Sequence, residues 1–171
     1  MSDAGKIMVV GLGEIGKPLL EVISRHLNAV GIDINPPDAR PNDIDVMHVC
    51  YPFKIDNFIG ETAKYINEYC PALTIINSTV SVGTTRTIAE LTGTPVVNSP
   101  VRGKHTRMAA DLLRYDKFVG GLDTESAQKA ARHFESIGMK TRVLSSPEST
   151  ELAKLKAAVK AFEENAAGTP G

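Results

Sequence analysis

The sequence predicts an α/β fold, in which strands and helices alternate around a doubly wound, mostly parallel sheet within a single domain. Short apolar runs typical of buried strands recur between segments with helical periodicity. The first run, Ile7 to Val10, passes directly into a glycine-rich turn. The length of 171 residues suits one domain with a substantial core.

The turn after the first strand has the spacing G-x-G-x-x-G at Gly11, Gly13 and Gly16, with Glu14 and Ile15 between the last two. This spacing gives a tight turn at the first glycine, room for a pyrophosphate at the second and close helix packing at the third. The phosphates then meet free amides at the helix N-terminus. The pattern predicts a dinucleotide site in a Rossmann-type sheet, and the alternative is an ordinary glycine turn without a nucleotide.

The second strand, Ala29 to Ile32, ends in Asp33. A carboxylate at this strand end can accept hydrogen bonds from the adenosine ribose hydroxyls, and its charge repels a 2′-phosphate. The sequence therefore predicts NAD, in preference to NADP, as the cofactor. We include the neighbouring Ile34 among the expected cofactor contacts.

The composition argues against several classes of protein. Hydrophobic residues make up 42% and charged residues 23%, and a formal net charge of −1 gives no electrostatic reason to expect nucleic acid. No apolar run approaches the roughly 18 residues of a membrane span, and the first residues do not resemble a signal peptide, so we expect a cytoplasmic protein. Cys50 and Cys70 form no C-x-x-C motif, and we expect reduced, half-buried thiols without a redox or metal role.

The next elements continue the alternation. The segment after Asp33, INPPDARPND, contains three prolines and predicts a loop in place of a crossover helix. Strands are expected at Asp45 to Tyr51 and at Leu73 to Asn77. The helix between these two strands has an apolar stripe, which consists of Ile55, Ile59, Ala63, Ile66 and Cys70.

The second half of the chain predicts three more strands, at Pro95 to Asn98, Lys117 to Val119 and Thr141 to Leu144. Gly120 and Gly121 should end the second of these. A short helical piece is expected at Met108 to Leu113. The inward positions of the two longer helices are expected to be Ile88 and Leu91 in one, and Ala127, Ala130, Phe134 and Ile137 in the other.

A last helix is expected to begin near Ser149 as its cap, with Leu152, Leu155, Val159 and Phe162 along one stripe. This divides the chain into a nucleotide-binding domain at 1–146, a C-terminal helix at 147–165 and a disordered tail at 166–171. Little sequence remains to cover the end of the stripe, which predicts a homodimer through this helix. The alternative is a monomer whose helix folds back on its own domain.

The four histidines differ in their sequence settings. His26 and His133 lie in helical patterns and are expected on the surface, and His48 lies inside a strand. Only His105 falls in a loop where chemistry is plausible.

Several segments resemble the cofactor-binding domain of the UDP-glucose/GDP-mannose dehydrogenases: GLGEIGKP, GIDINP, STVSVGTT, DLLRYDKFVGG and STELAKL, in the family's order. The resemblance covers Ile7 to Leu155. GLGEIGKP and NSPVRG are also similar to the related β-hydroxyacid dehydrogenases of the 6-phosphogluconate dehydrogenase superfamily. The resemblance implies a small-molecule substrate, a sugar nucleotide or a hydroxyacid.

The resemblance also implies roles for individual residues. Thr79, with Ser78 beside it, would contact the nicotinamide half of NAD or an ordered catalytic water, whereas both hydroxyls could instead cap the following helix. Lys154 matches the lysine that takes part in alcohol oxidation, and periodicity alone would make it a solvated lysine on an amphipathic helix. Arg102, Gly103 and His105 are candidates for the loop that contacts the substrate.

Departures from the family limit the expected chemistry. Val101 and His105 stand where the nucleotide-sugar enzymes have acidic residues, and Ala158 replaces an asparagine. The chain is also expected to stop before the domain that carries the family's nucleophilic cysteine, which aldehyde oxidation requires. We therefore expect at most a two-electron alcohol or carbonyl hydride transfer. The alternative is a non-catalytic nucleotide-binding or partner-binding module that has lost the chemistry.

Overall fold

The computed structural model describes residues 5–33, 41–101 and 105–167, without the side chains of residues 105, 158, 159, 161, 162 and 165–167. The strands are β1 (Lys6–Val10), β2 (Ala29–Ile32), β3 (Ile44–Val49), β4 (Leu73–Ile76), β5 (Val96–Asn98), β6 (Lys117–Gly121) and β7 (Thr141–Val143). The helices are α1 (Gly16–Ser24), α2 (Phe58–Tyr69), α3 (Thr84–Thr92), α4 (Met108–Arg114), α5 (Thr124–Ser136) and α6 (Pro147–Ala167), and a 3₁₀ turn (His105–Arg107) precedes α4.

The strands form one sheet in the order β2-β1-β3-β4-β5-β6-β7. The pairs from β2 to β5 are parallel, β6 pairs antiparallel with β5, and β7 is parallel to β6. The chain moves from β1 outward to β2 and then returns to β3 on the other side of β1. This reversal makes the carboxyl ends of β1 and β3 a topological switch point, where ligands bind in such sheets. The predicted fold class, a doubly wound and mostly parallel α/β sheet, is confirmed.

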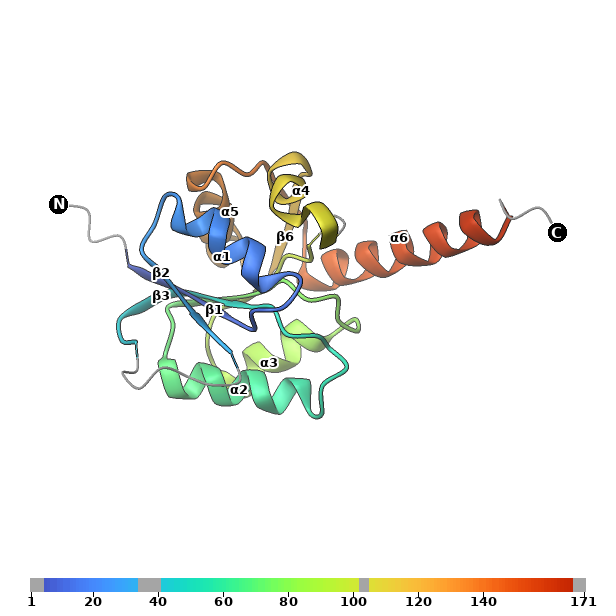
Figure 1. The fold of residues 1–171 in the computed structure, drawn as a ribbon. Coiled ribbons are helices and arrows are strands. Elements are labelled where there is room, and N and C mark those ends of the chain that lie inside the picture. Colours follow the sequence, from blue (N-terminus) through green and yellow to red (C-terminus); the bar gives the residue numbers. More distant parts are fainter. Residues whose placement is uncertain (1–4, 34–40, 102–104, 168–171) are drawn as a thin grey trace.

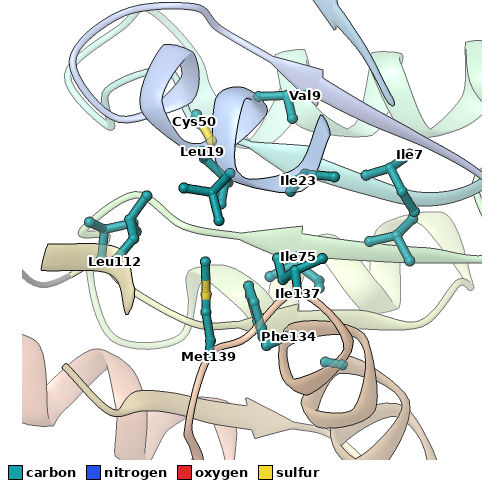
Figure 2. Close-up of a cluster of buried hydrophobic side chains, with 14 of the residues drawn as sticks. Ile7, Val9, Leu19, Ile23, Cys50, Ile75, Leu112, Phe134, Ile137 and Met139 are labelled. Carbon is teal, nitrogen blue, oxygen red and sulfur yellow. The ribbon is translucent and has the colours of Figure 1, made fainter. Parts of the chain in front are cut away.

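Helices cover both faces of the sheet. Figure 1 shows α1, α4 and α5 on one face and α2 and α3 on the other. Large side chains fill the layer under α1 and α5, among them Leu19, Ile23 and Phe134, which are fully buried (Figure 2). Since full burial of one such side chain contributes about 1.5–3 kcal/mol, this layer is a main source of the sheet's stability.

The last helix starts on the domain and then leaves it. Its first turn is fixed by Thr150, whose hydroxyl donates to Asn98 Oδ1 (2.7 Å), and by the buried Glu151. Figure 1 shows the rest of α6 extending away from the sheet toward the C-terminus. Within the described part of the chain, every helix is too short or too polar to cross a bilayer.

The predicted cap of this helix, Ser149, was wrong. Ser149 does not cap it, because the helix begins at Pro147 and Ser146 Oγ accepts the hydrogen bond from Ser149 N at 3.1 Å. Proline suits this first position because its missing N–H has no partner there in any case.

Three other expectations about the elements were wrong. Leu91 is 64% exposed, because the buried positions of α3 are Thr84, Thr85, Ile88 and Ala89, which centre on a different face. Ile55 precedes α2, since Asn57 caps that helix by accepting from Gly60 N (3.1 Å). Gly120 and Gly121 do not end β6 but belong to it. A Cβ at Gly120 would lie 2.4 Å from Ser146 O, so the glycine admits the chain leading into α6.

The cysteines and one histidine also differ from expectation. Cys50 is buried and Cys70 is exposed, so neither thiol is half-buried. Cys70 ends α2 in the left-handed conformation (φ 48°), which turns it away from the predicted stripe. His133, expected on the surface, is buried, whereas His26 is exposed as predicted.

Candidate functional site

A crevice opens at the switch point between β1 and β3. Its volume is about 460 Å³, within the range of small-molecule sites. A smaller hollow of about 160 Å³ adjoins it and shares Gly11, Asp33 and Tyr51. The residues that line the crevice are Gly11, Leu12, Gly13, Glu14, Ile15, Asp33, Cys50, Tyr51, Pro52 and Lys54.

The three glycines of the motif differ in their steric surroundings. Gly11 has φ +93°, a conformation that side chains rarely adopt, and its amide donates to Ile32 O at 2.8 Å. A Cβ on Gly16 would lie 1.6 Å from Gly11 O, so only glycine lets α1 approach the turn. A Cβ on Gly13 would meet nothing within 4 Å, so the fold itself does not require glycine there and the space beside it is open.

The start of α1 fits an anionic ligand. Ile15 occupies the cap position without a side-chain hydrogen bond, and the first turn contains no acidic residue. Helix N-termini that lack a protein cap attract phosphate through their amides and the helix dipole. Together with the open space at Gly13 and the exposed carboxylate of Asp33 at the end of β2, this arrangement suits a dinucleotide pyrophosphate with its ribose.

The hydroxyls after β4 lie at the same edge of the sheet. Ser78 is buried and donates from Oγ to Tyr51 O at 2.6 Å, which ties the end of β4 to the end of β3. Thr79 is exposed just beyond it. Neither hydroxyl caps α3, because the carboxylate of Glu151 accepts from Gly83 N (2.9 Å) and from Thr85 N (3.0 Å). The alternative capping role of Ser78 and Thr79 is therefore not what the structure shows.

Lys154 reaches this edge from α6. Its side chain is half-buried, and Nζ donates to Val101 O at 2.9 Å. Val101 follows β5 and its amide donates to Asn77 O at 3.1 Å. The structure thus brings Lys154 next to the loop after β5, which starts beside the loop that carries Thr79. Ile34, Arg102, Gly103 and the side chain of His105 lie outside the described residues.

A buried polar network, not predicted from the sequence, lies between the sheet and α5. Lys117 Nζ donates to Ser99 O (2.8 Å) and to Asn77 Oδ1 (3.2 Å). Asn77 Nδ2 lies 3.0 Å from His48 Nδ1, and His48 Nε2 lies 2.8 Å from His133 Nε2. The only sequence signal was that His48 and Lys117 interrupt otherwise apolar strands and that Asn77 directly follows one. Their side chains lie on the side of the sheet that α5 covers, where apolar residues are expected.

Burial lowers the pKa of the basic groups in this network. The pKa of Lys117 falls to about 7 through desolvation, and the neighbouring charge of Lys154 lowers it further. Desolvation lowers the pKa of His133 to about 4, and it lowers that of His48 well below its ordinary value. Both imidazoles are therefore neutral near pH 7, so one ring can donate and the other accept in the hydrogen bond between them.

The two thiols differ in their chemistry from an activated nucleophile. Burial raises the pKa of Cys50 to about 12, which keeps the thiol protonated although it lines the crevice. Cys70 lies at the end of α2, where its Sγ donates to Asn67 O at 3.5 Å. Catalytic cysteines require a lowered pKa, so Cys50 does not have the setting of a nucleophile, and Cys70 is not among the crevice residues.

Comparisons with known proteins find similarity to dehydrogenases. No family model matches it. The chain is 22% identical to the UDP-N-acetyl-D-mannosamine dehydrogenase of Campylobacter jejuni, over 91% of this chain and 53% of that protein. It is 23% identical to the protein of the same name from Methanocaldococcus jannaschii, over 88% of this chain and 47% of that protein. The solved structure of the UDP-N-acetyl-mannosamine dehydrogenase Cap5O from Staphylococcus aureus matches this structure with a TM-score of 0.78 at 16% sequence identity. The match covers 91% of this chain and 51% of the solved chain.

The match extends over nearly all of this chain but over only part of each relative. The chain spans about half the length of the curated relatives it matches. The likeness to the solved structure shows the shared fold, and the sequence matches agree with the motifs from GLGEIGKP to STELAKL. By sequence and by fold, the chain is similar to UDP-N-acetyl-D-mannosamine dehydrogenases, in line with the resemblance that its motifs indicated.

Proposed function

We propose that the chain binds NAD in the crevice between β1 and β3 and serves as the cofactor-binding domain of a dehydrogenase that acts on a sugar nucleotide. The proposal rests on three features that border one crevice of about 460 Å³: the glycine turn, the uncapped start of α1 and Asp33. The curated relatives are named for a sugar-nucleotide substrate, which supports this substrate class over a hydroxyacid.

Each residue has a defined task in this proposal. The amides near Gly13, Glu14 and Ile15 hold the pyrophosphate at the start of α1. Asp33 accepts hydrogen bonds from the adenosine ribose. When bound, NAD supplies the acceptor for a hydride from the substrate alcohol. Thr79 and Lys154 lie farther along the same edge, where we assign them to the nicotinamide side and to the substrate hydroxyl.

The cofactor assignment is tested by substitution of Asp33. Asp33→Ala should weaken NAD binding by roughly tenfold to a hundredfold, because a hydrogen bond to a charged group contributes about 1.5–3 kcal/mol. The same change should narrow the preference for NAD over NADP, since it removes the repulsion of the 2′-phosphate. Titration calorimetry with both cofactors measures the two effects.

A matched control is Asp56→Ala, which removes an exposed carboxylate that is not among the crevice residues. It should leave both affinities unchanged. Tighter binding of NADP than of NAD by the unsubstituted chain, or no binding of either, would contradict the proposal.

The chemistry is tested by the products that the chain forms. With NAD and a UDP-sugar, the 171-residue chain should form no uronic acid, because its only two cysteines are a buried thiol with a raised pKa and a distant exposed one. Any two-electron oxidation should fall at least a hundredfold in Lys154→Ala, since acid–base or electrostatic help of this kind contributes about 10²–10⁴ in rate.

Mass spectrometry of the products distinguishes the possible outcomes. Uronic acid made by the purified chain would refute the thiol argument. NAD binding without any hydride transfer would favour a non-catalytic nucleotide-binding module. Lys64→Ala is the control for the loss of a lysine, because Lys64 is exposed on α2 and is not among the crevice residues.

We also propose that two copies associate through α6. The helix leaves the domain, and a shallow groove of about 310 Å³ on it is lined by Leu152, Leu155, Lys156, Lys160 and Glu163. Leu152 is 43% exposed in the single chain. Covering this surface with a second copy would contribute about 1.5–3 kcal/mol for each fully buried leucine, and a two-fold pair is the simplest closed arrangement.

Light scattering at micromolar concentration tests this association. Leu155→Glu should convert a dimer to a monomer, because it introduces a charge into the groove. Ala157→Glu adds the same charge at an exposed position outside the groove and should leave the dimer intact. A monomeric mass for the unsubstituted chain at all concentrations would end the proposal.

A further inference from the structure

The buried amine of Lys117 is linked to the edge of the crevice through Asn77. It is 3% exposed, and its two described acceptors are neutral oxygens, Ser99 O and Asn77 Oδ1. Asn77 N in turn donates to Val49 O at 2.9 Å, and the next residue, Cys50, lines the crevice. Asn77 therefore connects the amine of Lys117 to the strand end that borders the space where we place the nucleotide.

The surroundings of Lys117 leave its charge without a described counter-ion. The neutral His48 lies on β3, and Cys50 directly follows that strand. On α5, the centre of the Phe134 ring lies 4.8 Å from Nζ. α6 contributes Lys154, which is of the same charge. The backbone carbonyl of Lys140, just before β7, accepts a hydrogen bond from Lys117 N. Lys140 itself is exposed. None of these groups is a carboxylate.

A lysine in such a position is costly for the fold, because burial without an opposite charge disfavours the ammonium form. An anion entering the crevice would supply the missing negative charge. We propose that Lys117 is a positioning residue for the cofactor crevice, and that binding of an anionic nucleotide there is coupled to protonation of its amine. This inference rests on the proposed nucleotide binding and specifies how that binding depends on pH.

The coupling follows from linkage. If the pyrophosphate favours the ammonium form of Lys117, then protonation must strengthen nucleotide binding by the same factor. The group is suited to respond near neutral pH, because its pKa is lowered to about 7, mainly by burial. The two histidines of the network do not compete in this range, since burial has lowered their pKa values too far.

The network also determines what the proton does to the structure. Lys117 holds Ser99 O and Asn77 Oδ1 together, and these residues begin the loops that lead to Val101 and to Thr79. An ammonium donates more strongly than a neutral amine, so protonation strengthens the hydrogen bonds to Ser99 O and Asn77 Oδ1. Nucleotide binding would thus fix the edge of the site at which Thr79 and Lys154 lie.

Titration calorimetry with ADP-ribose, the anionic part of NAD, tests the coupling. The groups of this ligand do not titrate near neutral pH, so any proton exchanged comes from the protein. Measurements at pH 7.5 in phosphate and in Tris, which differ in ionisation enthalpy, should reveal uptake of a fraction of a proton per ligand. Affinity should fall by roughly threefold to tenfold between pH 6.5 and 8.5.

Two variants and one control identify the group. Lys117→Gln keeps N–H donors for Ser99 O and Asn77 Oδ1 but cannot be protonated, and Lys117→Met removes both properties. Either variant should bind ADP-ribose without proton uptake and with the same affinity at both pH values. Lys140→Met, which removes an exposed lysine near the start of β7, should keep the full coupling.

The outcomes separate this inference from the proposed function. Binding by the unsubstituted chain without proton uptake would overturn the coupling and leave nucleotide binding intact. Uptake that persists in both folded Lys117 variants would also overturn it, because another group would then be responsible. Absence of any ADP-ribose binding at either pH would overturn the proposed function and this inference together.

Discussion

Replacement of Gly16 by alanine is expected to destabilise the fold by about 3 kcal/mol or more, because the new methyl group would collide with rigid backbone. The added Cβ would lie 1.6 Å from Gly11 O and 2.8 Å from Gly11 C. Neither atom belongs to a flexible side chain, so either α1 or the glycine turn must shift. Urea denaturation followed by circular dichroism measures the loss.

Gly13→Ala is the matched change in the same turn. A Cβ there meets nothing within 4 Å, so the stability should change by no more than about 0.5 kcal/mol. The methyl group would instead occupy the space we assign to the pyrophosphate, and nucleotide affinity should fall more than tenfold. Equal stability losses in the two variants would refute this separation of roles, and unchanged NAD affinity in folded Gly13→Ala would contradict the proposed position of the pyrophosphate.

The buried Lys117 should make the free energy of unfolding increase as the pH rises from 7 to 9. The pKa of this amine is about 7 in the folded chain against a usual 10.5, so in this range the unfolded state binds the additional proton. Stability supplied by the neutral amine is complete above the unfolded pKa and is lost as the pH falls toward 7. The expected gain is about 2–3 kcal/mol between pH 7 and 9.

Lys117→Met should remove this slope. At pH 7 the variant avoids the cost of the buried amine but leaves Ser99 O and Asn77 Oδ1 unpaired at roughly 1–3 kcal/mol each, so the two effects should largely cancel. Urea titrations at pH 7, 8 and 9 measure both effects. The control Lys140→Met alters an exposed lysine and should retain the slope. A slope of equal size in Lys117→Met would show that the buried amine is not its origin.

The fold class and the position of the nucleotide crevice can be predicted from local sequence patterns. Local rules suffice for these, since a strand followed by G-x-G-x-x-G and a helix forms one compact unit, and the next strand must end beside it. Gly11, Gly13 and Gly16 have the steric settings predicted for a tight turn, an open approach and close packing. Asp33 likewise lines the crevice, because strand ends in a parallel sheet share one edge.

Which polar residues are buried together depends on the packing of distant elements. Lys117, Asn77, His48 and His133 are separated along the chain and meet because β3, β4, β6 and α5 pack at one place. The helical position of His133 suggested the surface, since periodicity assigns a face of a helix but not its neighbours. Long-range packing also determines which side of α3 is buried, and Leu91 lies on the exposed side. The carboxylate that caps this helix belongs to Glu151, a residue far along the chain. These features depend on contacts between distant segments, which no local pattern of residues encodes.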